Sequence, residues 1–178
     1  LKANLTVETG GTSTQNSAES TWRLFPSSNL SQVFTANFTR SGFKVSEAAL
    51  IEPYTGGLFS LASVENDYKS GQDLKPATLQ SMIAGMRKAQ IPYVALGTLD
   101  AGQATDSAET GLKRVSITVN AKILDITALI PDTIASVGPV IFAGEGATED
   151  EARTNALKLA ATNASRELAS QITSLQIR

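Results

Sequence analysis

The stretch from Gly144 to Arg153, written GEGATEDEAR, has the residue types that could begin a phosphate-binding loop. A strand that runs through glycines into a helix can present backbone N–H groups and the helix dipole to an anion. Here, however, the first helical turn carries Glu149, Asp150 and Glu151, whose charges already satisfy that dipole. Glu149 replaces the third glycine of a dinucleotide fingerprint, and no phosphate-loop Lys-Ser/Thr follows. We therefore expect the glycines to end a strand before a capped helix, not to form a nucleotide site.

Carboxylates also cluster in the segment from Asp100 to Glu109, which includes Asp106. Their spacing does not match a twelve-residue calcium loop, so a solvated hairpin tip is favoured, with a bound ion left open. Asp125 and Asp132 flank a predicted turn, whereas a carboxylate hydrolase needs two buried acids with different pKa values. The sequence therefore predicts no catalytic, cofactor-binding or metal-binding residues.

Composition excludes several other kinds of chemistry. The 178 residues include no cysteine and no histidine, so thiol chemistry, histidine bases and ordinary zinc sites are absent. No G-x-S-x-G motif is present among the many serines. The formal net charge is −2 with no basic stripe, so we expect no nucleic-acid partner. Hydrophobic residues make up 42% and charged residues 18%, which is typical of a globular domain.

The order of predicted elements is strand, helix, strand, helix, a three-stranded meander and a long helix. Strands are expected at 5–8, 43–46, 93–99, 115–123 and 140–143, and helices near 29–41, 75–90 and 148–174. This order predicts an α/β sandwich with a mixed sheet and packed helices. Residues 1–28 are expected to form an N-terminal strand and a Gly/Ser/Thr-rich arm, and residues 29–178 the α/β domain. The strand within residues 1–8 is expected to join the sheet of that domain.

The final helix is the clearest element. Thr148 and Glu151 form a capping box, and alanine, leucine or isoleucine recurs every four residues from Ala152 to Ile172. At about 1.5 Å per residue the helix is roughly 40 Å long. A seam of small residues allows such a helix to lie close to a sheet or to another helix.

Three segments together resemble envelope domains related to the curli secretion lipoprotein. They are NLSQVFTANFTRSGFKVSEA, SGQDLKPATLQSMIAGMRKAQIPYVALGTL and VSITVNAKILDITALIPDTIASVGPVIFAGEGATEDEARTNAL. Similar domains occur in the amino-terminal part of TolB and in flagellar assembly protein T. The likeness covers about residues 30 to 175. One departure is Ala48-Ala49, which stands where the family has an arginine, so contacts made there are not carried over.

The resemblance implies a non-enzymatic assembly component of a Gram-negative flagellar, pilus or secretion machine, located in the periplasm. Copies would pack side by side, and a head-to-tail contact that closes under rotation gives a ring. The arm at 9–21 would order on a neighbour. The alternative is a monomeric periplasmic module that docks on one envelope partner. A third hypothesis, an enzyme that uses only carboxylates and serine, has no supporting constellation.

Partners are therefore expected to be proteins, including copies of the chain, and no small-molecule substrate is expected. No apolar run approaches the roughly 20 residues that cross a bilayer, so membrane association would be peripheral, at the outer membrane. The chain begins at Leu1 rather than Met, so we expect processing or trimming, and a lipid anchor could precede it. Trp22, Phe25 and Tyr54 are expected to fill the core, with an exposed partner patch as the alternative.

Overall fold

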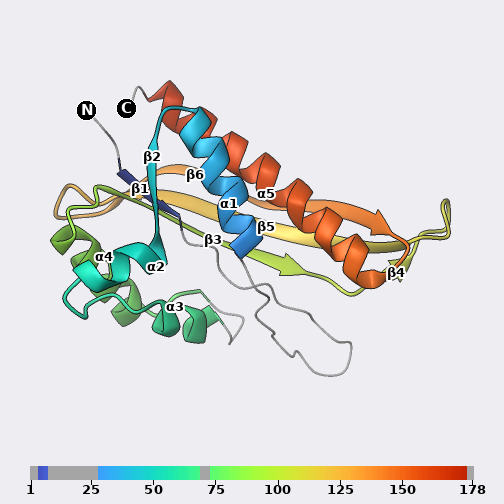
Figure 1. Ribbon diagram of the computed structural model, residues 1–178, viewed down its shortest axis with the longest axis horizontal. Helices are drawn as coiled ribbons and strands as arrows, with labels where there is room; N and C mark the ends of the chain where they lie inside the picture. The colour runs from blue at the N-terminus through green and yellow to red at the C-terminus, as the bar shows by residue number, and fades with distance from the viewer. Residues whose placement is uncertain (1–3, 8–27, 69–72, 176–178) are drawn as a thin grey trace.

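The computed structural model describes residues 4–7, 28–68 and 73–175. Its elements are β1 (Asn4–Val7), α1 (Ser28–Arg40), β2 (Lys44–Glu47), α2 (Ala48–Ile51), the 3-10 turn η1 (Glu52–Tyr54), α3 (Leu61–Tyr68), α4 (Pro76–Lys88), β3 (Tyr93–Ala101), β4 (Thr105–Asp106), β5 (Lys113–Asp125), β6 (Asp132–Gly146) and α5 (Glu149–Ser174). Figure 1 shows helices packed against one long twisted sheet. The predicted fold class, an α/β sandwich with a mixed sheet and a long C-terminal helix, is confirmed.

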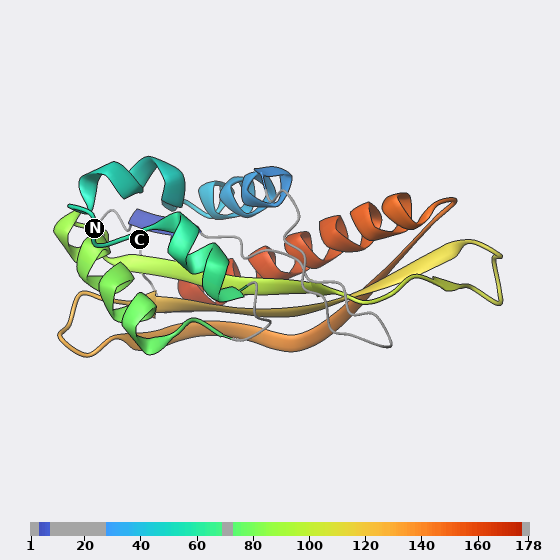
Figure 2. The ribbon, with the colours of Figure 1, turned by 90° about the horizontal axis from the view of Figure 1, so that it is seen from below.

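The sheet combines a parallel part with an antiparallel meander. β1 lies between β2 and β3 and is parallel to both, while β5 is antiparallel to β3 and to β6. The two-residue strand β4 pairs with the beginning of β5 and extends the β3 side of the sheet into a hairpin. In Figures 1 and 2 this hairpin projects from the end of the molecule opposite α2 and α4. The sheet therefore has two distinct ends, which carry different side chains.

One face of the sheet is covered by α1 and α5, whose buried side chains share a core with those of β3, β5 and β6. The predicted alanine seam of α5 is buried against this face; its members are Ala152, Ala156, Ala160, Ala164, Leu168 and Ile172. Phe38 of α1 is fully buried in the same core and meets Phe43 edge to face, with ring centroids 6.3 Å apart. Gly42 makes this return possible because its φ of 90° lies in the left-handed region.

The opposite face is covered by α2, α3 and α4 over only part of its area. Its core joins Met82 and Met86 of α4 to Val94 and Leu96 of β3, with Phe59 also buried. Pro76 occupies the first turn of α4, as the sequence predicts, because its missing N–H has no intrahelical partner there. Residues 48–68, where the sequence analysis places no helix, are mostly helical and complete this layer.

Gly144 and Gly146 allow the close packing of α5 on β6. A Cβ atom built on Gly144 would lie 2.3 Å from the backbone nitrogen of Ala156, and one on Gly146 would lie 2.7 Å from that of Ala152. The absent side chains therefore let the helix lie directly on β6. The expected strand, glycines and capped helix are confirmed, and the close approach explains why glycine is required at both positions.

Two sequence predictions differ from the structure. β6 spans Asp132–Gly146, far longer than the predicted 140–143, because register shifts in the β5–β6 pairing disrupt the alternation that marks a strand. Tyr54 is 71% exposed, so the prediction that it fills the core is wrong. Trp22, Phe25 and the arm at 9–21 lie outside the described residues.

Candidate functional site

The acidic residues at the hairpin end do not converge on a site. Asp100 belongs to β3, whereas Asp106 lies in β4 and accepts a hydrogen bond from Lys113 at 2.6 Å. That ion pair raises the pKa of Lys113, chiefly through the hydrogen bond to Asp106. Within residues 4–7, 28–68 and 73–175, no group of three or more acidic, histidine or cysteine side chains could hold a metal ion.

The helix N-terminus beside this hairpin is internally satisfied. The Thr148 side chain accepts a hydrogen bond from the Glu151 N–H at 3.2 Å, and the Glu151 carboxylate accepts one from the Ala147 N–H at 3.0 Å. Arg153 donates to Glu149 at 2.7 Å and to Asp150 at 2.8 Å. These bonds already occupy the charges of the first turn.

A buried carboxylate at the other end has a structural role. Asp67 of α3 is 5% exposed and accepts a hydrogen bond from the Lys75 N–H at 3.0 Å, just before α4 begins. A hydrogen bond from Thr78, together with the Lys75 N–H and ammonium, lowers the pKa of Asp67 despite its burial. Asp67 therefore joins α3 to the start of α4 through Lys75 and Thr78.

The β5–β6 turn presents two apolar side chains to solvent. Leu129 is 88% exposed and Ile130 is 74% exposed, and we call this pair the apolar tip. Exposed apolar pairs on a turn are mobile unless the backbone beneath them is fixed. Here Asp125 accepts hydrogen bonds from the N–H and hydroxyl of Thr127, at 2.9 and 2.6 Å, as expected of a turn aspartate.

Arg87 of α4 holds the other side of the same turn. Its guanidinium donates to the carbonyl oxygens of Ile126 at 2.9 Å, Ala128 at 2.5 Å and Leu129 at 3.1 Å. Ile126 itself is buried in the core beneath α4. The apolar tip is therefore displayed on a backbone fixed from both sides. Leu50 and Tyr54, 67% and 71% exposed, lie on α2 and η1 at the same end of the molecule (Figure 1).

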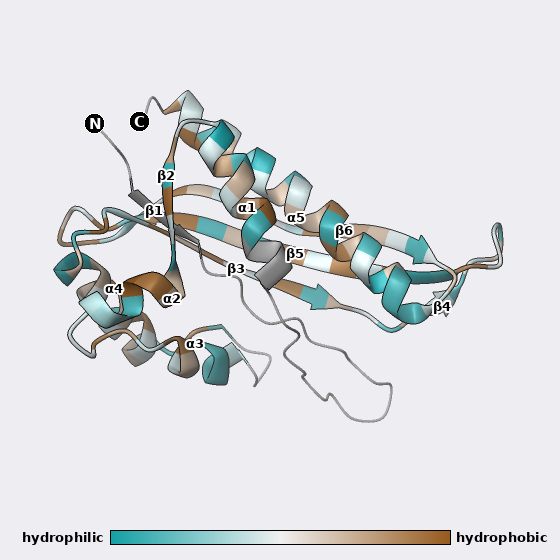
Figure 3. Cartoon of the chain, viewed as in Figure 1, coloured by the Kyte–Doolittle hydropathy of each residue, from teal (hydrophilic) through white to brown (hydrophobic). Residues whose placement is uncertain are grey.

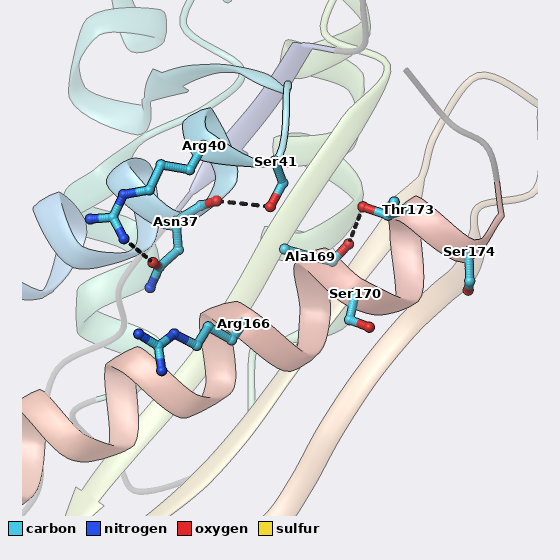
Figure 4. A pocket seen from close by; sticks show the side chains of 8 residues that line it. All are labelled: Asn37, Arg40, Ser41, Arg166, Ala169, Ser170, Thr173 and Ser174. Carbon is cyan, nitrogen blue, oxygen red and sulfur yellow. Dashed lines mark hydrogen bonds between the residues drawn. The ribbon is translucent and has the colours of Figure 1, made fainter.

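A groove runs between α1 and α5 (Figure 4). Its volume is about 490 Å³, and it is lined by Asn37, Arg40, Ser41, Arg166, Ala169, Ser170, Thr173 and Ser174. Two of these side chains are cationic and none is acidic. The groove therefore offers cationic and hydroxyl groups on a surface to which apolar atoms also contribute.

A buried hydrogen-bond chain forms the floor of this groove. Asn37 donates to the Ser165 hydroxyl at 2.6 Å, and Ser165 donates in turn to the Ala161 carbonyl at 2.7 Å. Arg40 donates to the Asn37 amide oxygen at 3.3 Å. Asn37 and Ser165 are 9% and 0% exposed, so each needs these partners to offset its desolvation. The chain fixes how α1 lies on α5 and positions the Arg40 guanidinium at the groove.

Sequence reasoning missed both the groove and the apolar tip. In the sequence Asn37 stands at helical spacing from Val33 and Phe34, and an amide within such an apolar stripe is the available signal of a buried polar contact. For the tip, the signal was two apolar residues directly before Pro131 in a predicted turn. Neither signal identifies the distant residue that completes the feature.

Comparisons with known proteins give only distant likenesses. No protein-family model matches the chain, and no curated protein matches it. None of the helices in the described ranges is long and apolar enough to cross a membrane.

Three solved structures are distantly similar to the chain over nearly its whole length. One is the hypothetical protein CT253 from Chlamydia trachomatis, with 10% sequence identity, a TM-score of 0.47, and coverage of 97% of this chain and 96% of that one. A minor lipoprotein from Acinetobacter baumannii has 12% identity and a TM-score of 0.41, with coverage of 98% of this chain and 94% of that one. Lipoprotein GNA1162 from Neisseria meningitidis has 12% identity and a TM-score of 0.44, with coverage of 97% of this chain and 99% of that one. Their descriptions mention no curli, TolB or flagellar protein, so membership of that group stays a prediction. At these identities and TM-scores, what the chain shares with bacterial lipoproteins is a distant likeness of fold.

Proposed function

We propose that the chain is a non-enzymatic component of the Gram-negative cell envelope that docks on another protein through the apolar tip. The envelope location and the non-enzymatic role come from the sequence resemblance. The observation that carries the docking role is the tip itself, where Leu129 and Ile130 are 88% and 74% exposed on a backbone held by Arg87. Because the backbone of this turn is already fixed, binding would order only the two side chains, so less conformational entropy is lost than for a mobile loop.

The charges around the tip favour a protein over a lipid surface. Asp125 and Asp132 lie opposite each other at the base of the turn, where a membrane-binding loop would carry lysine or arginine. Arg87 donates its N–H groups to backbone carbonyls, so it is not free to meet lipid phosphates. An anionic bilayer would therefore be repelled at this point. Peripheral outer-membrane association is accordingly the weaker alternative.

Strand addition at the free edge of β6 is also disfavoured. Within the described residues β6 pairs with β5 on one side, and side chains of α5 cover its other edge at two points. Gln171 exchanges two hydrogen bonds with the Ser136 backbone, at 2.8 and 2.9 Å, and Asn155 donates to the Glu145 carbonyl at 2.8 Å. Pro139, between these points, has no N–H to donate. Packing of copies through β6 would therefore use side-chain surfaces, not a continued sheet.

The test compares the wild-type chain with the double variant Leu129→Ser/Ile130→Ser after gentle extraction from cell envelopes, with the mass of each particle measured. We expect the wild type in a complex and the variant as a single chain. Leu112→Ser, which removes an exposed leucine at the hairpin end, is the control and should leave the complex intact. A single-chain mass for the wild type would contradict the proposal. Closed rings of one chain would favour the oligomeric hypothesis, and loss of vesicle binding in the double variant would favour the membrane.

A further inference from the structure

The two arginines of the α1–α5 groove have no ion-pair partner in the described part of the chain. Arg40 is the only charged residue of α1, whose sequence is SNLSQVFTANFTR. Arg166 lies on α5, where the positions three and four residues away are Thr162, Asn163, Ala169 and Ser170. None of these positions is acidic, so the i,i+3 and i,i+4 pairs that commonly neutralise a helical arginine are absent. Figure 4 shows both side chains beside the groove between the helices.

Three of the four hydroxyl groups that line the groove have their hydrogens committed elsewhere; the fourth belongs to Ser170. Ser41 donates to the Asn37 carbonyl at 3.0 Å, Thr173 to the Ala169 carbonyl at 2.7 Å and Ser174 to the Gln171 carbonyl at 2.7 Å. A hydroxyl has a single hydrogen, so each of these oxygens offers only lone pairs to a ligand. The groove therefore combines cationic donors from Arg40 and Arg166 with acceptor oxygens from three hydroxyls.

This combination selects between kinds of anion. A fully ionised phosphate has only acceptor oxygens. It could accept hydrogen bonds from the arginines, but its oxygens would be repelled by the lone pairs of the committed hydroxyls. A peptide that bears a carboxylate has acceptors on the carboxyl group and donors on its backbone N–H groups. Arginine guanidinium groups also match the planar geometry of a carboxylate. A groove of about 490 Å³ has room for a few residues around that group.

We propose that the groove between α1 and α5 binds a carboxylate-bearing peptide segment, with Arg40 and Arg166 on the carboxylate and the hydroxyls on peptide N–H groups. Asn37 acts as a positioning residue because it holds Arg40 from the buried side. The proposal rests on the proposed protein-binding role only in its choice of a peptide as ligand. The groove and the apolar tip are made of different residues and can be tested separately.

The experiment is a titration of the isotope-labelled chain, followed by the NMR signals of its arginine side chains. The probes are the peptide Gly-Glu-Gly-Glu-Gly with blocked ends, its Gly-Gln-Gly-Gln-Gly counterpart, and inorganic phosphate. We expect the acidic peptide to shift the Arg40 and Arg166 signals saturably, and the glutamine peptide and phosphate to bind about tenfold more weakly or less. Arg87, Arg114 and Arg153 serve as internal references.

Variants separate the groove from general charge effects. Arg40→Gln or Arg166→Gln should each weaken the acidic peptide by about tenfold, and Arg166→Lys should lie between wild type and Arg166→Gln. Lys158→Gln removes the same charge from an exposed position of α5 outside the groove and should leave binding unchanged. The tip variant Leu129→Ser/Ile130→Ser should also bind the peptide normally, so failure of the docking proposal would not be mistaken for failure of this one.

Three results would overturn the inference. Equal shifts with the acidic and glutamine peptides would show that no carboxylate is recognised. Phosphate that binds as tightly as the acidic peptide would show a general anion site. Peptide binding that Lys158→Gln weakens as much as Arg166→Gln would show attraction to net charge alone. Since Arg40 and Arg166 are exposed, their variants are expected to fold, and the unchanged signals of the reference arginines verify this.

Discussion

Two arginines of α5 show how differently the ends of this molecule are built. Arg153, near the first turn, bridges Glu149 and Asp150, whereas Arg166, toward the last turns, lines a groove without an acidic residue. The same contrast holds beyond the helix. At the hairpin end Lys113 pairs with Asp106 and Arg114 with Glu145, while the opposite end exposes the apolar tip. In Figure 3 the first turns of α5 are hydrophilic and α2 is hydrophobic.

This difference indicates at which end of the molecule a partner could gain interactions that the chain does not already make. Where charges are paired within the chain, a partner would have to replace bonds that already exist. Where cations lack a pair, or apolar side chains stand in water, a partner gains the interaction outright. Among the described residues, the charges at the hairpin end are paired within the chain, whereas Arg40 and Arg166 of the groove have no ion pair and Leu129 and Ile130 of the tip are exposed.

The largest expected effect concerns the close contact between α5 and β6 near the hairpin end. Gly144→Ala should destabilise the fold by about 3 kcal/mol, because its Cβ would meet the backbone of Ala156 and α5 would have to move. Gly102→Ala is the matched control, since its Cβ would meet nothing nearer than the Ser116 carbonyl at 3.5 Å. Urea unfolding of both variants measures the difference. Equal stabilities would show that α5 does not need this close approach.

How much of this arrangement the sequence predicts depends on the range of the interactions. α5 was predicted closely because its capping box and its four-residue apolar repeat are local signals. β6 was only partly recognised because its length is set by pairing with β5 across register shifts, which no local alternation records. The groove depends on a hydrogen bond between Asn37 and Ser165, 128 positions apart, so composition and periodicity could not reveal it.

The next effect concerns the rigidity of the β5–β6 turn that carries the apolar tip. Arg87→Gln should lower stability by about 1.5 kcal/mol, because three backbone carbonyls lose a charged donor. It should also weaken partner docking without altering Leu129 or Ile130 themselves. Lys88→Gln, an exposed neighbour on the same helix, is the control for the lost charge. Urea unfolding and hydrogen exchange of residues 127–130 measure the two effects. Unchanged exchange in Arg87→Gln would show that the tip is held by other contacts.

A smaller effect concerns the pH dependence of the contact that Asp67 makes between α3 and α4. Since the pKa of Asp67 is lowered in the fold, its stabilisation is fully present above the usual value of 3.8 and is lost as the pH falls through the folded pKa. Asp67→Asn should therefore cost about 1 kcal/mol at pH 6 and progressively less below pH ~4. Urea midpoints of both chains at pH 6 and pH 3 give the comparison, with exposed Glu65→Gln as the control. A difference that is constant with pH would mean that the carboxylate charge is not involved.

The smallest expected effect is the most direct test of the contrast within α5. Arg153→Gln should cost about 0.5 kcal/mol, because its two ion pairs lie partly in solvent and also support the acidic first turn. Arg166→Gln should cost nothing measurable in the free chain, since no ion pair in the described residues is broken. Thermal unfolding in low and high salt distinguishes the two variants. Salt should reduce the loss of stability of Arg153→Gln relative to wild type and leave the stability of Arg166→Gln relative to wild type unchanged. A salt-sensitive loss in Arg166→Gln would mean that this arginine already has an ionic partner within the chain, and the groove would then have no uncompensated charge to offer a ligand.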